Sequence, residues 1–153
     1  MNPSDMVEML AARKARAVAA LLDDGIVIGA DTVVVLDNQA LGKPADLNDA
    51  VEMLRRLQGK SHEVYTGVAL ADAGRRKIII DHAKTRVYFK PLQEAEIRKY
   101  VSTGEPLDKA GAYAVQGLAA MFITRLEGCY TNVVGLPLAK LADMLQEFGY
   151  RVL

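Results

Sequence analysis

The chain has 153 residues, of which 51% are apolar and 25% are charged, and 19 basic side chains balance 19 acidic ones. This composition is typical of a folded domain with a hydrophobic core, and zero net charge excludes a broad attraction to nucleic acid or an anionic membrane. No apolar stretch approaches the roughly 18 residues of a membrane-spanning helix, and the N-terminal residues lack a secretory signal pattern. The single cysteine, Cys129, fits a reducing cytoplasm. We therefore expect one cytoplasmic domain over residues 1–153, with no nucleic-acid or membrane partner.

The first sixty residues predict a helix, a strand and a second helix. In chain order, the expected elements are a helix over 3–22, a strand over 26–36, a turn at 37–39, a loop at 41–44 and a helix over 47–57. Ser4 or Asp5 is the candidate N-cap of the first helix, and Gly25 is its candidate end. Asp46 is placed to cap the second helix, which Gly59 closes.

The remainder of the chain predicts further strands, connected by a turn, a helix and a long loop. In chain order, these are strands over 63–71 and 77–81 around a turn at 72–75, a strand over 84–89, a helix over 93–101, a glycine-rich loop over 104–117, a strand pair over 118–124 and 128–134, a last helix between Pro137 and Gly149, and a short final strand over 150–153. Strands that alternate with helices predict an α/β fold, with a mixed central β-sheet and flanking helices.

A lone carboxylate, Asp31, interrupts the apolar run of the first strand. Burying a charge without a partner is costly, so such a position is tolerated where a cation or a metal ion lies opposite it. Lys43, between Gly42 and Pro44, is one candidate cation, and a bound metal is the other. The alternative, a strand-end aspartate that only caps a turn, is about as common on local sequence alone.

The loop over 104–117 holds charged and amide side chains among small residues. Glycine in such a loop allows a ligand to approach the backbone closely, and lysines neutralise phosphate oxygens. The alternative is a structured loop in which Asp108 and Lys109 pair with each other in solvent, and the spacing does not decide between the two. Lys14 reads from local sequence as a solvated helix lysine. His62 and His82 have no second His or Cys at metal-ligand spacing, so we expect structural or solvent-exposed roles for both.

Taken in order, several segments resemble the Maf family of nucleotide pyrophosphatases, once called septum formation proteins. The matching segments are Gly29-Ala30-Asp31-Thr32-Val33-Val34, Gly42-Lys43-Pro44, Met53-Leu54 through Gly59, His62-Glu63-Val64-Tyr65-Thr66-Gly67, Gly104-Glu105-Pro106-Leu107-Asp108-Lys109-Ala110-Gly111-Ala112-Tyr113, Gln116-Gly117 and Asn132-Val133-Val134-Gly135-Leu136-Pro137-Leu138. They cover almost the whole chain, and the resemblance implies a Maf/ITPase-like sheet.

The resemblance also implies an activity, which is hydrolysis of a nucleoside triphosphate between its α- and β-phosphates with Mg²⁺ or Mn²⁺. The Asp-Lys-Ala-Gly-Ala-Tyr and Gln-Gly segments look like the branch that acts on dTTP, UTP and modified pyrimidine nucleotides, in a house-cleaning role. By this resemblance Asp31 accepts the proton of the attacking water and lies at the metal. Lys14 and Lys43 contact phosphates, and Thr32 and Gln116 bear on base choice. Asp108 and Lys109 are expected to bind substrate with them.

One departure from the family pattern concerns the N-terminus. Family members begin with a strand and a Ser-x-Ser-Pro-Arg-Arg loop, whereas Met1 here already lies beside the helix that precedes Asp31. We therefore expect the first strand and an arginine-rich phosphate loop to be missing, which would expose a sheet edge and favour a homodimer. A truncated chain, a misassigned start and a naturally short member all stay open. The leading hypothesis is a pyrophosphatase impaired by this loss; the alternative is a non-catalytic nucleotide-binding or regulatory protein linked to cell division.

Overall fold

The computed structural model describes residues 1–153 and shows an α/β fold with one five-stranded sheet of order β2-β1-β3-β4-β5. The strands are β1 (Ile26–Leu36), β2 (Gln39–Leu41), β3 (Ser61–Asp72), β4 (Lys77–Phe89) and β5 (Ile123–Glu127). The helices are α1 (Pro3–Ala19), α2 (Leu47–Leu57), α3 (Glu94–Ser102), α4 (Tyr130–Val134) and α5 (Leu138–Glu147), and the short 3-10 helices are η1 (Glu105–Asp108), η2 (Ala110–Ala112) and η3 (Leu118–Phe122). The predicted α/β class is confirmed.

The contacts of the chain divide it into two compact units. Unit 1 comprises Met1–Thr32, Tyr65–Lys84 and Cys129–Leu153, and unit 2 comprises Val33–Val64 and Thr85–Gly128. The chain therefore passes from one unit to the other within β1, β3 and β4. The expectation of one domain over residues 1–153 stays a prediction.

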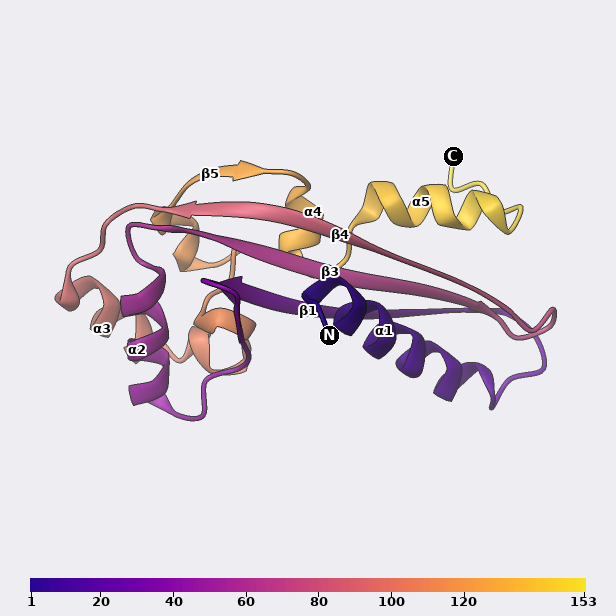
Figure 1. The fold of residues 1–153 in the computed structure, drawn as a ribbon, viewed down its shortest axis with the longest axis horizontal. Coiled ribbons are helices and arrows are strands. Elements are labelled where there is room, and N and C mark those ends of the chain that lie inside the picture. The colour runs from indigo at the N-terminus through magenta and orange to yellow at the C-terminus, as the bar shows by residue number, and fades with distance from the viewer. The chain divides into compact units, whose positions relative to one another are not determined.

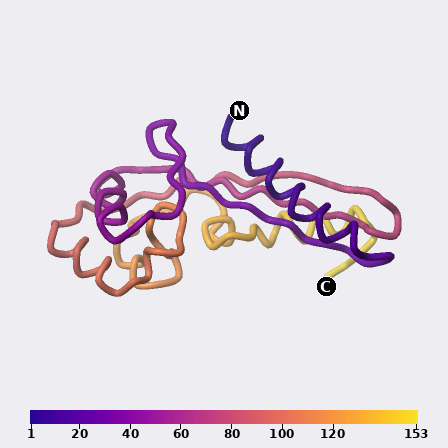
Figure 2. The backbone as a smooth tube through the Cα atoms, turned by 90° about the horizontal axis from the view of Figure 1, so that it is seen from below, coloured from indigo at the N-terminus to yellow at the C-terminus, as the bar shows by residue number.

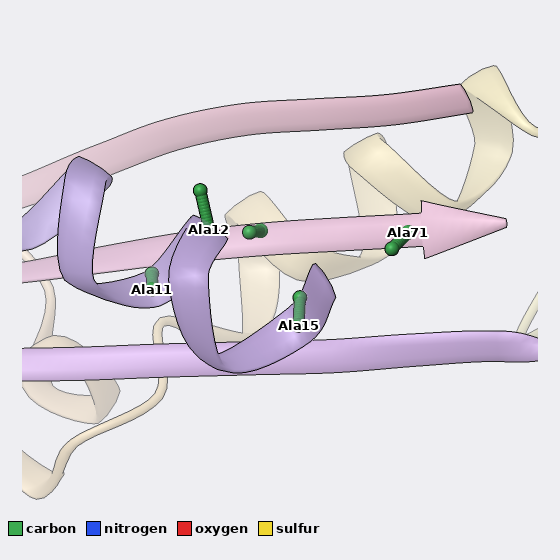
Figure 3. Close-up of a cluster of buried hydrophobic side chains, with 5 residues drawn as sticks. Ala11, Ala12, Ala15 and Ala71 are labelled. Carbon is green, nitrogen blue, oxygen red and sulfur yellow. The ribbon is translucent and has the colours of Figure 1, made fainter. Parts of the chain in front are cut away.

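In unit 1, helices α1 and α5 lie on opposite faces of the strands (Figure 1). Side chains of β3 point alternately to the two faces, as those of a strand must. On one face Ala69 and Ala71 pack with the alanines of α1, of which Ala11, Ala12 and Ala15 are shown in Figure 3. On the other face Val68 and Leu70 pack with apolar side chains of α5: Leu141, Met144 and, just after the helix, Phe148. Figure 2, in which the protein is seen from below, shows α1 lying over the strands.

Unit 2 is built around helices α2 and α3 and a cluster of aromatic rings. Arg55 of α2 donates to Glu94 of α3, with 2.9 Å between Nε and Oε2. The rings of Phe89 and Tyr113 meet edge to face with 4.9 Å between their centroids. Antiparallel pairing joins β1 to β2 and β4 to β5. This core supports the loops that carry the predicted substrate-binding residues of unit 2.

Several predicted elements are confirmed at or near their predicted bounds. Strand β1 has the predicted limits, and α2 begins after Asp46, whose Oδ1 accepts from the Asp49 N–H at 2.8 Å. In α1 the cap is Asn2, rather than Ser4 or Asp5, because the Asn2 side chain accepts from the Asp5 N–H. The first helix ends at Ala19, before the predicted Gly25, and the strands predicted over 77–81 and 84–89 form one strand, β4.

The strand pair predicted over 118–124 and 128–134 is wrong. The structure has η3, then β5, and then α4 in place of the second strand. Gly135, at φ +129°, ends α4, and its N–H donates to the Thr131 carbonyl at 3.1 Å. This local closure outweighs the strand preference of threonine and valine. The residues predicted as a last strand, 150–153, have no regular structure. No helix has the length and apolarity needed to cross a membrane.

Candidate active site

Asp31 of β1 forms an ion pair with Lys14 of α1. Lys14 Nζ lies 2.8 Å from Asp31 Oδ1 and also donates to the Ala30 carbonyl at 3.1 Å. The Asp31 side chain is 20% exposed, whereas that of Lys14 is 57% exposed. The cation opposite Asp31 in unit 1 is thus Lys14, which local sequence presents as an ordinary solvated helix lysine. The pair leaves a half-buried carboxylate with a fixed orientation and a neighbouring positive charge.

Two glycines allow α1 to lie close enough for this ion pair. A Cβ atom at Gly29 would lie 2.3 Å from the Ala11 carbonyl oxygen, and one at Gly67 would lie 2.2 Å from the Val7 carbonyl oxygen. Real Cβ atoms do not approach backbone so closely, so the helix backbone rests directly on these glycines. Gly29 is two residues before Asp31, which places both on the face of β1 that α1 covers. The approach of the helix therefore brings Lys14 to Asp31.

Thr32 faces the opposite side of β1 from Asp31. Its Oγ1 lies 2.8 Å from Thr66 Oγ1, and Thr66, which is fully buried, donates to the Asn132 carbonyl at 3.0 Å. Because a hydroxyl has one proton, Thr32 is the donor in its bond to Thr66. Its remaining lone pairs are acceptors. The structure thus brings Lys14 and Asp31 together and places Thr32 in a separate hydrogen-bonded chain.

In unit 2, Lys43, Asp108 and Lys109 form a small charged cluster. Lys109 Nζ lies 3.2 Å from Asp108 Oδ1. The hydrogen bond from Lys109, and the charge of Lys43, hold the pKa of the Asp108 carboxyl below its usual range. The predicted alternative of an Asp108–Lys109 pair in solvent matches the geometry, because the Asp108 side chain is 74% exposed. The charge of Lys43 acts on the same carboxylate, in addition to the direct contact from Lys109.

The backbone of residues 110–112 is fixed by packing against the rest of unit 2. Gly111 has φ +72°, its N–H donates to the Gly42 carbonyl at 3.1 Å, and a Cβ atom there would lie 2.9 Å from a methyl of Val34. The next residue, Ala112, also has positive φ, at +65°, although it is not glycine. The loop that carries Lys43 is thereby attached to the segment that follows Lys109. At Gly111 the close approach is made by Val34 rather than by a ligand.

The two histidines differ in their surroundings. His62 is 2% exposed, its Nε2 lies 2.7 Å from the Tyr113 hydroxyl, and burial lowers its pKa to about 4. His82 is half-buried, with Nδ1 2.7 Å from Glu8 Oε1. His82, Glu8 and Asp81 form a group whose possible metal-ligand atoms lie within 4.8 Å of one another. Sequence spacing does not reveal this group, because Glu8 comes from α1. Asp81 is already paired with Lys140 at 2.9 Å.

Asp31 has the chemistry of a ligand for a divalent metal ion. Magnesium is commonly held by one or two carboxylates together with water and substrate phosphates, rather than by a full protein cage. Lys14 bonds to Oδ1 of Asp31, and the side chain remains partly exposed. A half-buried single carboxylate therefore fits a metal ion whose other ligands are water and phosphate oxygens.

Sequence reasoning missed Tyr100 and Glu105, which surround the segment that carries Gln116. Tyr100 donates to Glu105 Oε2, and Glu105 Oε1 accepts from the Leu118 N–H at 3.2 Å. Gln116 itself is exposed. Glu105 belongs to the Gly104-Glu105-Pro106 motif, but nothing in local sequence indicates which backbone group its carboxylate would meet.

Comparison with known proteins supplies the family of the chain. The sequence model of the family described as "Maf-like protein" matches residues 1–148. A protein named dTTP/UTP pyrophosphatase from Pelotomaculum thermopropionicum is 67% identical over 153 residues, which cover 100% of this chain and 80% of the relative.

Further relatives have the same name. A dTTP/UTP pyrophosphatase of Desulforamulus reducens is 54% identical over 152 residues, covering 99% of this chain and 80% of the relative. Another, from Symbiobacterium thermophilum, is 52% identical over 151 residues, which cover 99% of this chain and 77% of the relative. On these matches, and on the family match across nearly its whole length, the chain belongs to the Maf family.

Proposed function

We propose that this protein is a nucleoside triphosphate pyrophosphatase that hydrolyses the α–β phosphate linkage of dTTP, UTP and modified pyrimidine nucleotides. The observation that carries the proposal is the half-buried Asp31 carboxylate held by Lys14 in a chain whose relatives are named dTTP/UTP pyrophosphatase. These names favour an enzyme over the non-catalytic alternative. The products are a nucleoside monophosphate and pyrophosphate.

In the proposed mechanism Asp31 is the general base. A water oxygen bonds to one phosphorus of the α–β linkage, the bridging P–O bond breaks, and its electron pair leaves with the bridging oxygen. The water proton passes to the Asp31 carboxylate. Lys14 orients that carboxylate, which is the kind of positioning on which phosphoryl transfer chiefly depends.

The remaining predicted residues are proposed to bind the nucleotide. Lys14, Lys43 and Lys109 offer positive charge to phosphate oxygens, and Asp108 orders Lys109 through their ion pair. Thr32 and Gln116 are proposed to act on base choice. A divalent ion, Mg²⁺ or Mn²⁺, held by Asp31 together with the substrate phosphates would neutralise charge on those phosphates.

The direct test measures pyrophosphate released from dTTP, UTP and 5-methyl-UTP in Mg²⁺ and in Mn²⁺. Asp31→Asn removes the base while keeping the shape of the side chain, so we expect a loss of about 100-fold or more in kcat. Asp37→Asn is the matched control, since Asp37 lies at the exposed turn after the same strand. Unchanged turnover in Asp31→Asn would reject Asp31 as the base. Nucleotide binding without pyrophosphate release by the wild-type protein would favour the non-catalytic alternative.

We also propose a homodimer in the cytoplasm, with no nucleic-acid partner. In support of association, β2 pairs with β1 only at Val34–Leu36, and Ile28, which lies earlier in β1, is 45% exposed. Light scattering on the purified protein measures the mass: twice the chain mass is expected, and a monomer at micromolar concentration would reject the dimer.

A further inference from the structure

Tyr100 and Glu105 hold the short segment of unit 2 that carries Gln116. The Ala114 N–H donates to the Tyr100 hydroxyl at 3.2 Å, the hydroxyl donates to Glu105 Oε2, and Glu105 Oε1 accepts from the Leu118 N–H at 3.2 Å. The two backbone groups lie two residues before and two residues after Gln116. This chain of hydrogen bonds therefore fixes the backbone on both sides of one exposed amide side chain.

The carboxylate of Glu105 also packs directly against that segment. A Cβ atom at Gly117 would lie 2.1 Å from Glu105 Oε1, so only glycine leaves room for the carboxylate there. Each Glu105 oxygen has a donor, and the Tyr100 hydroxyl both donates and accepts. Hydrogen bonds to a charged acceptor are stronger than those between neutral groups, and linked bonds reinforce one another.

Tyr100 is itself immobilised in the core of unit 2. It is 4% exposed, and its ring meets that of Phe122 edge to face with 5.1 Å between centroids. Burial, together with the bond to Glu105, raises the pKa of the Tyr100 phenol, so the hydroxyl keeps its proton at any physiological pH. Tyr100 is thus a buried neutral group that can both donate and accept a hydrogen bond at physiological pH.

We propose that Tyr100 and Glu105 are positioning residues that fix the backbone on both sides of Gln116 and thereby set which pyrimidine base is accepted; this rests on the proposed function and on the expected contact between Gln116 and the base. A primary amide has a donor end and an acceptor end, so its orientation decides what it can read. Uracil and thymine present a carbonyl where cytosine presents an amino group. An amide carried by a fixed backbone reaches the base from one position and can distinguish them, whereas an amide on a loosened segment can present either end and accept both.

The test compares kcat/KM for UTP and CTP in the wild-type protein and in Tyr100→Phe. Removing the hydroxyl breaks two hydrogen bonds and leaves the Ala114 N–H and one Glu105 oxygen without this partner. We expect the UTP-to-CTP ratio to fall about fivefold, through faster use of CTP, while kcat for UTP changes less than twofold. Tyr88→Phe is the matched control, because the Tyr88 hydroxyl also donates to a glutamate, Glu127, at 3.1 Å on the exposed β4–β5 pair.

Two additional variants separate positioning from a general loss of stability. Glu105→Gln keeps an oxygen for the Leu118 N–H, so its UTP-to-CTP ratio should stay closer to the wild-type value than that of Glu105→Ala. In a Gln116→Ala background, Tyr100→Phe should leave the ratio where Gln116→Ala alone puts it, because the positioned group is gone. A further fall in that background, or an unchanged ratio in folded Tyr100→Phe, would overturn the proposal. If Tyr100→Phe does not fold, the two Glu105 variants decide by the same criterion.

The outcome is distinguishable from failure of the proposed function. If the wild-type protein binds nucleotides but releases no pyrophosphate, the ratio of dissociation constants for UTP and CTP takes the place of the kinetic ratio. The positioning proposal then stands or falls on that ratio alone. Failure of both nucleotides to bind would overturn both proposals together.

Discussion

The two units of this protein place their predicted site residues by different physical means. In unit 1, Lys14 reaches Asp31 because the backbone of α1 rests on Gly29 and Gly67, whose missing side chains allow the close approach. In unit 2, side-chain hydrogen bonds and left-handed backbone hold the segments that carry the predicted residues, as at Gly111. Backbone contact tolerates no added atom, whereas hydrogen bonds can be removed one at a time. One added atom should therefore displace the site residues of unit 1 completely, whereas removal of one hydrogen bond should displace those of unit 2 only in part.

The largest expected effect follows from adding one methyl group at the helix contact. Gly29→Ala would place a Cβ atom 2.3 Å from the Ala11 carbonyl oxygen, so α1 must shift. We expect a loss of about 3 kcal/mol in the free energy of unfolding, together with loss of turnover because Lys14 moves away from Asp31. Urea denaturation measures the first and pyrophosphate release the second.

Gly42→Ala is the matched control for this prediction. Nothing lies within 4 Å of a Cβ atom at Gly42, so its free energy of unfolding should change by less than about 0.5 kcal/mol. Equal midpoints for Gly29→Ala and the wild-type protein would show that the helix adjusts at no cost, and the contrast between the two units would then be lost.

The second prediction concerns the core of unit 2 and pH. Burial lowers the pKa of His62 to about 4, whereas an unfolded chain has the ordinary value of 6.5. Between these values the unfolded chain binds more protons, so stability rises with pH through this interval and is lost as pH falls from 6.5 to 4. This shift in the pKa of His62 changes the free energy of unfolding by about 3 kcal/mol across the interval. Thermal unfolding of wild type and His62→Gln from pH 4 to 7 measures it.

His62→Gln keeps a polar group near the Tyr113 hydroxyl but does not titrate, so its stability should depend less on pH over this range. Parallel curves for wild type and His62→Gln would show that His62 does not carry the pH dependence.

Sequence alone predicts the elements whose ends carry local signals. Strand β1 lies between Gly25 and a turn at Asp37 and Asn38, both of which have positive φ, and α2 begins at an aspartate cap. The region 128–134 is different, because valine and threonine indicate a strand while the closure at Gly135 favours a helix turn. Where propensity and local hydrogen bonds disagree, the pattern of residue types does not decide.

The candidate site also contains one residue that local sequence indicates and others that it does not. Asp31 stands out as a charge in an apolar run, but its partner Lys14 lies 17 positions away and is brought to it only by the glycine contacts. The resemblance to a family supplied Lys14 as an expectation, while composition and spacing could not. Glu105 and Tyr100 were missed for a related reason. Their function is to accept from backbone N–H groups, and sequence does not show which backbone groups lie within reach.

The smallest expected effect on stability comes from the charged cluster of unit 2. The side chains of Lys109 and Asp108 are 44% and 74% exposed, so solvent screens their ion pair and Lys109→Met should change the free energy of unfolding by less than about 0.5 kcal/mol. If Lys109 neutralises a phosphate, however, the same change should raise KM for UTP by roughly tenfold, the effect of one lost charge-assisted contact. Lys90→Met, at another exposed lysine of unit 2, removes the same charge and should leave KM unchanged. Equal KM values for both variants would assign Lys109 to the surface pair alone, and would leave Lys43 as the phosphate-binding lysine that unit 2 supplies.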